Sequence, residues 1–284
     1  MSSHDLHLRE FTGQTEAAER IRRNHDGRRR RVLAGLGAVL LGATTIGVGG
    51  ASAAVKPSSK TKTKSAPTAT VPSNPCPAST NTTVAALINT KYANVSKVYE
   101  TADDTKQPRN YLAVGIDLAG DIVYTVNKTE GDWLNVNVPS RPNGAVGWIK
   151  KNEVSTFQHP YLIKIELGIR RLTVCNAGRI IQQEKIGVGK SERPTPTGNF
   201  YTADLLRPKG GPNGAYGPFA FGLSGFSDTV FDFAGGDGRL GIHGTNHPEL
   251  LGTPASNGCI RVSNAGITKM AKTLPLGVPV QITA

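Results

Sequence analysis

The sequence predicts a mainly β protein that consists of two small domains in series, and three observations indicate this fold class. Between residues 93 and 155, short apolar stretches alternate with clusters of turn-forming residues at intervals of about ten residues, which is typical of a small barrel. Residues 161–167 alternate apolar and polar side chains, as a half-buried strand does. Glycine and proline are frequent between residues 207 and 244, which indicates long loops and little helix.

The first predicted domain covers residues 84–156. Its first segment, residues 84–91, has a composition that fits either a short helix or a strand. Turn clusters such as Arg141-Pro142-Asn143-Gly144 separate the apolar stretches that follow. The strands expected in this domain are Val95–Tyr99, Tyr111–Ile116, Asp121–Val126, Trp133–Val138 and Ala145–Ile149.

The second predicted domain covers residues 160–284 and contains one helix. Ser263 can cap this helix and Pro275 ends it, and the apolar residues between them recur at the spacing of a single buried face. The turn Asn176-Ala177-Gly178 is expected to join two strands into a hairpin. The expected strands are Tyr161–Leu167, Arg170–Val174, Arg179–Gly189, Asn199–Ala203 and Val278–Thr283, and the apolar helix residues are Ile267, Met270, Ala271 and Leu274.

The chain ahead of the first domain is predicted to be an export signal and a linker. Residues 1–31 form a basic cytoplasmic tail that ends in four consecutive arginines, and residues 32–55 carry no charge. This pattern fits a signal peptide cleaved near Ala53, at the small-residue motif Ala51-Ser52-Ala53, or an uncleaved membrane anchor. Both alternatives place everything after Lys56, including the Pro/Thr/Lys-rich linker of residues 56–83, outside the cytoplasm.

The net charge of +12 raises the question of a nucleic-acid partner, and its distribution argues against one. Residues 1–31 hold eight Lys/Arg against five Asp/Glu, and residues 56–80 hold four lysines and no acid. More than half of the excess charge therefore precedes the predicted domains, which contain no long basic run with interleaved aromatic residues. We expect no nucleic-acid partner, and an anionic cell envelope fits the mild positive charge better.

The three cysteines leave at least one thiol unpaired within the chain. Cys76 and Cys175 can pair and leave Cys259 free, and three free cysteines are the alternative. A free thiol outside the reducing cytosol is a liability, so such a cysteine needs an explanation.

Cys259 and His243 form a candidate pair for nucleophilic catalysis. A free thiol is only a few per cent ionised at neutral pH, and a nearby imidazole can accept its proton. Gly258 permits a tight turn in which the N–H groups of Gly258 and Cys259 can point at a developing oxyanion. Asn257 tolerates a left-handed backbone, and Arg261 can hold a substrate carboxylate by paired hydrogen bonds. On residue types alone, a buried structural cysteine is the alternative.

Several ordered motifs surround this pair in the second domain. They are His243-Gly244-Thr245, Gly252-Thr253 and Ser256-Asn257-Gly258-Cys259-Ile260-Arg261-Val262, preceded by Arg171-Leu172-Thr173-Val174, Gly187-Val188-Gly189-Lys190 and Pro194-Thr195-Pro196-Thr197-Gly198-Asn199-Phe200. Together they resemble the signature of the YkuD-type L,D-transpeptidases. The resemblance spans about residues 161–282 and implies a β-rich catalytic domain.

The same resemblance implies roles for individual residues. Cys259 would be the acyl-accepting nucleophile and His243 its base, with the backbone carbonyl of Gly244 orienting the imidazole. The implied donor is a peptidoglycan tetrapeptide stem that loses its terminal D-alanine, and the implied acceptor is an amine of a neighbouring stem. Carbapenem-type β-lactams are the implied inhibitors, and no metal or cofactor is expected. The residues expected to bind substrate are Thr245, Ser256, Asn257 and Arg261.

One position departs from the family pattern. Many members have a histidine directly before the Gly-Cys pair, where this chain has Asn257. His243 matches the base of the family, so this difference should not abolish catalysis. It puts in doubt any role of a second histidine in positioning the substrate or stabilising the oxyanion.

A second resemblance concerns the end of the first domain. Gly131-Asp132-Trp133-Leu134-Asn135-Val136 is followed by Asn143-Gly144-Ala145-Val146-Gly147-Trp148-Ile149, and these two segments resemble the ending of a bacterial SH3-like domain. The resemblance implies a small SH3-like barrel with a cell-wall or peptide ligand. The alternative is that both tryptophans are core residues of a spacer domain.

Other functions stay open from the sequence. With water as the acceptor, the same nucleophile gives an L,D-carboxypeptidase, and with a protein lysine it gives a protein-to-peptidoglycan attachment enzyme. A non-catalytic wall-binding protein is a further alternative, against which the intact Cys/His pair argues. A zinc hydrolase would need a helix for its H-x-x-x-H spacing, which the local glycines and proline disfavour. Its ligands would be His243, His247, Glu249 and Cys259.

Overall fold

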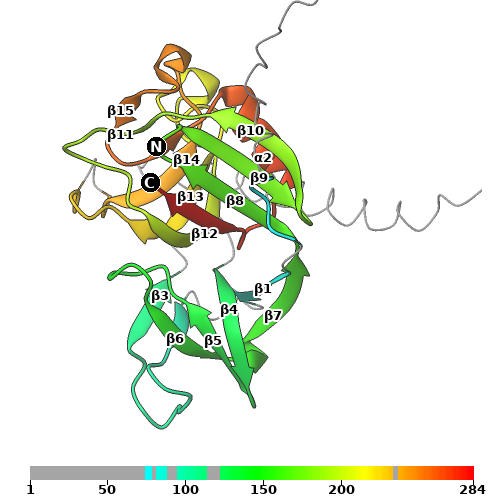
Figure 1. Ribbon diagram of the computed structural model, residues 1–284. Coiled ribbons are helices and arrows are strands. Elements are labelled where there is room, and N and C mark those ends of the chain that lie inside the picture. The colour runs from blue at the N-terminus through cyan, green and yellow to red at the C-terminus, as the bar shows by residue number, and fades with distance from the viewer. Residues whose placement is uncertain (1–73, 79–80, 88–94, 114–121, 233–235) are drawn as a thin grey trace, which may run out of the picture. The chain divides into compact units, whose positions relative to one another are not determined.

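The computed structural model describes residues 74–78, 81–87, 95–113, 122–232 and 236–284, which Figure 1 shows as coloured ribbon. All of them fall within one unit of the chain. The predicted cytoplasmic tail, signal or anchor segment and most of the linker lie outside the described residues. Within the described part, no helix is long and apolar enough to cross a membrane.

The described part of the chain is mainly β, as predicted, and its N-terminal strands form a five-stranded antiparallel sheet of order β6-β5-β4-β1-β7. Two more strands, β2 (Val95–Val98) and β3 (Asn110–Ala113), pair with each other, and a bridge from Tyr99 to Trp148 joins them to β6. The strands of the sheet are β1 (Thr82–Leu87), β4 (Val123–Glu130), β5 (Trp133–Asn137), β6 (Val146–Lys150) and β7 (Val154–His159).

These strands match most of the expected positions in the first domain. The segment that fits either a helix or a strand is the strand β1 over its described part. β7 is a strand that the sequence pattern does not predict. Residues 88–94 and 114–121 of the first domain lie outside the described part. The SH3-like barrel therefore stays a prediction.

The two tryptophans of the first domain lie at the edge of its core. Trp133 is half-buried and meets Tyr99 edge to face, with ring centroids 5.2 Å apart. Trp148 is also half-buried, and the Lys128 ammonium lies 5.0 Å from the centre of its ring. The fully buried residues of this core include Tyr124 and Val136. Each tryptophan therefore keeps part of its surface accessible.

The second domain is built on an eight-stranded sheet of order β10-β9-β8-β17-β12-β13-β14-β16. The C-terminal strand β17 lies between β8 and β12 and runs parallel to β8 (Figure 1). β16 runs parallel to β14, and the other neighbours are antiparallel. The strands are β8 (Tyr161–Glu166), β9 (Arg171–Asn176), β10 (Arg179–Lys185), β12 (Gly198–Leu206), β13 (Ala220–Phe226), β14 (Arg239–His243), β16 (Ile260–Arg261) and β17 (Pro279–Thr283).

The predicted helix is present as α2 (Asn264–Thr273). Ser263 caps it as expected, because its Oγ accepts a hydrogen bond of 2.9 Å from the Gly266 N–H. Ile267, Met270 and Ala271 are buried and form part of the main hydrophobic core of the second domain. The apolar face of the helix is therefore used for packing, as its spacing predicts.

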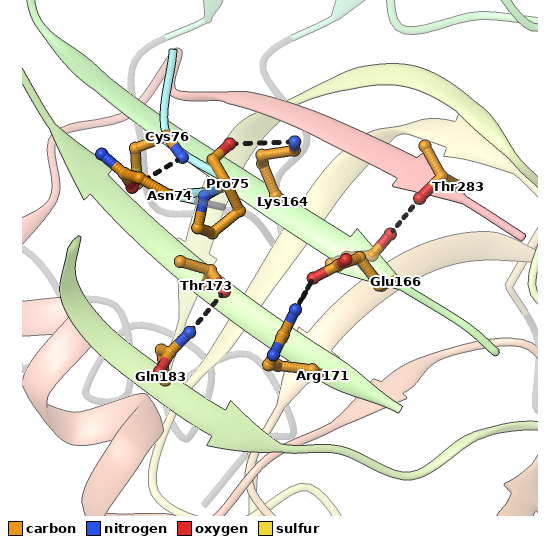
Figure 2. Close-up of polar contacts among 10 residues, drawn as sticks. Asn74, Pro75, Cys76, Lys164, Glu166, Arg171, Thr173, Gln183 and Thr283 are labelled. Carbon is orange, nitrogen blue, oxygen red and sulfur yellow. Dashed lines mark hydrogen bonds and ion pairs between the residues drawn. The ribbon is translucent and has the colours of Figure 1, made fainter. Parts of the chain in front are cut away.

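Cys76 and Cys175 form a disulfide, and Cys259 is the free cysteine. This settles the alternatives that the cysteine count left open. Figure 2 shows the segment from Asn74 to Cys76 beside β8, where Lys164 Nζ donates a hydrogen bond of 2.9 Å to the Pro75 carbonyl. Asn74 Nδ2 donates another, also 2.9 Å long, to the Gly178 carbonyl. The end of the linker is thus attached to the sheet of the second domain covalently and by hydrogen bonds.

Removing this disulfide is expected to lower the melting temperature without removing the free thiol. The two cysteines are 99 residues apart, and closing a loop of that length contributes about 5 kcal/mol in the chain-entropy model. We expect the double variant Cys76→Ser, Cys175→Ser to melt about 10 °C below the wild type. Thermal unfolding measures this, and reduction of the wild type should reproduce the shift. Equal melting temperatures for the oxidised, reduced and variant proteins would contradict the expectation.

A small shared core connects the two sheets. It contains Val84 and Val123 from the first sheet and Tyr201 and Ala203 from β12. The buried Tyr201 hydroxyl lies 3.1 Å from the Val123 carbonyl oxygen and 3.2 Å from that of Asn137. The first domain is therefore packed against the strand that precedes β13.

Candidate active site

Cys259 ends a tight turn between β15 (Pro254–Ser256) and β16. The Ser256 hydroxyl holds both sides of this turn, because it donates a 2.6 Å hydrogen bond to the Cys259 carbonyl and accepts one of 3.1 Å from the Gly258 N–H. Gly258 has a φ of +116°, which side-chain-bearing residues rarely adopt. The sequence Ser-Asn-Gly-Cys thus folds locally into the turn that presents the thiol.

Two expectations about this turn need correction. The Gly258 N–H is already bonded to Ser256, so it is not free to stabilise an oxyanion as expected. The Ser256 hydroxyl is likewise occupied within the turn, and Ser256 shapes the nucleophile turn rather than offering a free group to substrate. Among the described residues, the Cys259 N–H makes no hydrogen bond. That N–H is the remaining backbone donor of the expected pair.

Thr195 supports the nucleophile turn from the P-T-P-x-G loop. Its buried hydroxyl donates a hydrogen bond of 2.8 Å to the Gly258 carbonyl and accepts one of 2.9 Å from the Gly189 N–H. Gly189 ends β11 (Val188–Gly189), which pairs with β15. The P-T-P-x-G motif is visible in the sequence, but the role of Thr195 is not, because it depends on a hydrogen bond to Gly258, 63 residues further along the chain.

His243 ends β14 and is buried, with 4% of its surface exposed. Its Nδ1 lies 2.6 Å from the Gly244 carbonyl oxygen. A carbonyl oxygen can only accept, so Nδ1 carries the proton and Nε2 is left with a free lone pair in the neutral ring. The ring of Tyr216 packs on the imidazole at a centroid distance of 4.7 Å.

Gly244 is held in place by a close contact with α2. A Cβ at this position would collide with the Asn264 side-chain oxygen, which accepts a hydrogen bond of 2.8 Å from the Thr245 N–H. Thr245 itself is buried, and its hydroxyl accepts a hydrogen bond from the His247 N–H. Thr245, which was expected to bind substrate, does not line the pocket described below, and its hydrogen bonds in the described part of the chain are local.

Cys259 and His243 line the same pocket, which encloses about 620 Å³ including its solvent-open part. The parallel pairing of β14 with β16 explains how residues distant in sequence meet there, because it places Ile242 opposite Ile260. Asn257, Ser256 and Arg261, three of the four residues expected to bind substrate, also line the pocket. The structure therefore brings together five of the expected site residues around one cavity.

Burial keeps both reacting groups neutral in the resting site. It lowers the pKa of His243 to about 4, although the hydrogen bond with Gly244 acts in the opposite direction. Burial also raises the pKa of the Cys259 thiol, and a hydrogen bond from the Gly241 N–H and the charge of Arg261 offset part of the rise. A neutral thiol therefore lies in one pocket with a neutral imidazole that can act as a base.

Two arginines give the pocket its positive charge. Arg261 Nε is buried and has no hydrogen-bond partner among the described residues. Arg239, which the sequence did not single out, also lines the pocket and forms an ion pair of 2.8 Å with Asp204. Burial raises the pKa of Asp204, and the charge of Arg239 opposes that rise. Arg239 is thus already paired, whereas Arg261 retains an unsatisfied donor.

The second domain is similar in sequence to a known family and to individual proteins. Residues 160–282 match the family model of the YkuD L,D-transpeptidase catalytic domain. YqjB of Bacillus subtilis (strain 168) is 33% identical over 126 residues, which are 44% of this chain and 71% of that protein. This chain belongs to the YkuD family of L,D-transpeptidases. YkuD of the same strain is 37% identical over 123 residues, which are 43% of this chain and 66% of that protein. Both relatives bear provisional names as L,D-transpeptidases, and the chain spans about two thirds of their length.

Solved L,D-transpeptidase structures also match the YkuD-family chain, at low similarity. The structure of LD transpeptidase LdtMt1 in complex with imipenem is 14% identical, with 56% of this chain and 97% of that one covered and a TM-score of 0.37. L,D-transpeptidase 3 from Mycobacterium tuberculosis, in complex with a faropenem-derived adduct, is 15% identical, with 51% and 76% covered and a TM-score of 0.37. Likenesses at this level carry no further conclusion about this family member.

The zinc alternative does not fit the geometry of this YkuD-family site. His247 Nδ1 lies 2.9 Å from a Glu249 carboxylate oxygen on the surface, and neither residue lines the pocket. The described residues contain no group of three or more His, Cys, Asp or Glu side chains that could hold a metal ion. The four residues of the proposed zinc set are therefore not gathered at one point.

Proposed function

We propose that this chain is a peptidoglycan L,D-transpeptidase in which Cys259 forms a thioester with a donor stem peptide and His243 is the general base. The observation that carries the proposal is a free thiol in one pocket with an imidazole whose Nδ1 proton is bound by the Gly244 carbonyl. This arrangement leaves Nε2 to accept a proton. Membership of the YkuD family supports the choice of acyl transfer between stem peptides.

In the proposed acylation, His243 Nε2 accepts the Cys259 thiol proton as Sγ attacks the donor carbonyl carbon. The donor carbonyl belongs to the diaminopimelate-type residue of a tetrapeptide stem. The Cys259 N–H is the backbone donor placed to stabilise the oxyanion. The C–N bond to D-alanine then breaks, and His243 returns the proton to the departing amine.

In the proposed second step, an amine of a neighbouring stem attacks the thioester carbonyl. His243 takes a proton from that amine, the thiolate leaves and is reprotonated, and a cross-link between stems results. Arg261 is proposed to hold a substrate carboxylate, since its buried Nε has no other partner in the described part of the chain. Asn257 lines the same pocket and is proposed to contact substrate.

The acceptor distinguishes the proposed reaction from its nearest alternatives. Incubation of the purified protein with disaccharide-tetrapeptide, followed by mass analysis, should give a cross-linked dimer with loss of one D-alanine. A tripeptide product alone would indicate an L,D-carboxypeptidase and overturn the transpeptidase proposal. Incorporation of a lysine-containing protein in place of the dimer would indicate an attachment enzyme.

The place of action and the role of the first domain are also proposals. The charge pattern of residues 1–55 supports export to the extracytoplasmic side of the membrane, by cleavage near Ala53 or with an anchor at 32–55. The accessible faces of Trp133 and Trp148 support a cell-wall ligand for the SH3-like domain. Carbapenems are proposed inhibitors, because the motifs around Cys259 and His243 place the second domain in the YkuD family.

The pH dependence of acylation should reflect the lowered pKa of His243. Because burial lowers this pKa to about 4, the base form prevails until the pH falls through about 4. We expect the second-order rate constant for acylation by imipenem to keep its value down to about pH 5 and to halve near pH 4. A rate profile over pH 3–8, with folding checked by circular dichroism, measures this. A midpoint near 6.5 would mean that the base has an ordinary histidine pKa.

A further inference from the structure

The turn Arg141-Pro142-Asn143-Gly144 of the first domain contacts the segment that follows β13. Arg141 Nη1 donates a hydrogen bond of 3.0 Å to the Ser227 carbonyl. Its Nη2 donates to the carbonyls of Val230, at 3.2 Å, and Asp237, at 3.0 Å. One guanidinium therefore joins three points of the segment that are separated in sequence. No other donor among the described residues reaches these three carbonyls.

Asn143 adds a second connection to the same segment. Its side-chain amide donates to the Phe226 carbonyl at 2.8 Å, and its oxygen accepts from the Phe226 N–H at 2.8 Å. This reciprocal pair resembles the bonding of a neighbouring strand and fixes the last residue of β13. The Arg141 guanidinium also lies over the rings of Phe226 and Phe231, 5.1 Å and 4.6 Å from their centres.

The segment held in this way is one wall of the active-site pocket. Ser227, Val230 and Gly238 line the pocket together with Cys259 and His243. Within the wall, the Ser227 N–H donates to the Gly238 carbonyl at 2.8 Å, and Ser227 Oγ accepts from the Val230 N–H at 3.1 Å. A Cβ on Gly238 would collide with the Val230 carbonyl, the same group that accepts from Arg141. The wall is thus tightly packed at the Val230 carbonyl, to which Arg141 donates its hydrogen bond.

We propose that Arg141 and Asn143 are positioning residues of the transferase, through which the first domain sets the shape of the substrate pocket. This inference rests on the proposed function. The two residues touch neither Cys259 nor His243, and they act by holding the wall formed by 226–232 and 236–238. The first domain would then contribute to acyl transfer through the shape of the pocket, in addition to binding any ligand of its own. Displacement of a pocket wall by about 1 Å can slow a reaction by about a hundredfold.

Full-length variants test this inference with two separate readouts. The variants are Arg141→Ala and Asn143→Ala, and Arg109→Ala is the matched control because it removes an exposed arginine from the same domain. Hydrogen–deuterium exchange should accelerate in peptides covering 226–232 and 236–240 of the first two proteins only. The rate constant for Cys259 acylation by imipenem should fall about ten- to a hundredfold in them and stay unchanged in the control.

Each outcome decides one part of the inference. If hydrogen–deuterium exchange in the wall is unchanged in both variants, then Arg141 and Asn143 do not hold the wall, whether or not the wild type is a transpeptidase. Faster exchange with an unchanged acylation rate would reduce Arg141 and Asn143 to a structural role and overturn the positioning claim. Arg141→Lys should be intermediate, because a lysine keeps the charge but lacks the fork that spans three carbonyls. A wild type that forms no adduct and no cross-link would instead refute the proposed function. Hydrogen–deuterium exchange alone would then show whether Arg141 and Asn143 hold the wall.

Discussion

The Cys259→Ala variant is expected to lose cross-linking activity by about 10⁴-fold or more. Cys259 is the free cysteine of the chain and ends the turn that Ser256 and Thr195 hold in the pocket. Without Sγ no thioester can form, and the remaining pocket can only bind the substrate. Dimer formation from disaccharide-tetrapeptide, followed by mass analysis, measures the loss.

The disulfide variant Cys76→Ser, Cys175→Ser is the matched control for this loss. It removes two of the three cysteines but leaves the free thiol, so its activity at a temperature well below melting should be close to that of the wild type. If Cys259→Ala keeps more than about 1% of the wild-type rate, another group is the nucleophile.

The His243→Gln variant is expected to lower the acylation rate by about 10²- to 10⁴-fold. Glutamine removes the base but can still donate a hydrogen bond to the Gly244 carbonyl, which His243 Nδ1 reaches at 2.6 Å. The loss of acylation rate should therefore result from the missing proton acceptor and not from a collapse of the site. Stopped-flow or timed mass measurement of imipenem acylation gives the rate.

His247→Gln provides the control for the second histidine of the same stretch. His247 is paired with Glu249 on the surface and lies outside the pocket, so its replacement should leave the acylation rate unchanged. Equal losses of acylation rate in His243→Gln and His247→Gln would contradict His243 as the specific base and would indicate a site that uses both histidines.

Local signals in the sequence were sufficient for much of the fold. The hairpin β9–β10 around Asn176-Ala177-Gly178 and the helix capped by Ser263 were predicted because each depends on residues close in the chain. Long loops and little helix are predicted between residues 207 and 244, yet β13 lies in the middle of this region and β14 at its end. Glycines within β13 caused this, since a Cβ at Gly222 would collide with Asp204 and one at Gly225 with Phe200. These glycines make room for neighbours from β12, and only the sheet pairing reveals that role.

The candidate site was predictable in its residues but not in its hydrogen bonds. The motifs around Cys259 and His243 identified both residues, and the parallel pairing of β14 with β16 explains their common pocket. The sequence could not show that Ser256 occupies the Gly258 N–H or that Thr245 is buried away from the pocket. Nor could it show Arg141, which meets the pocket wall from a position 86 residues away. The Arg141 contact depends on the packing of one domain against the other, whereas the bonds of Ser256 and Thr245 depend on the folding of the second domain.

Intact-mass spectrometry of the protein with imipenem shows whether Cys259 is the acyl-accepting nucleophile. We expect a single adduct with the mass of the whole inhibitor on the wild type, located by peptide mapping on the segment that contains Cys259. We expect no adduct on Cys259→Ala under the same conditions. An adduct that persists on Cys259→Ala, or a folded wild type with a free thiol and no adduct, would contradict Cys259 as the acyl-accepting nucleophile.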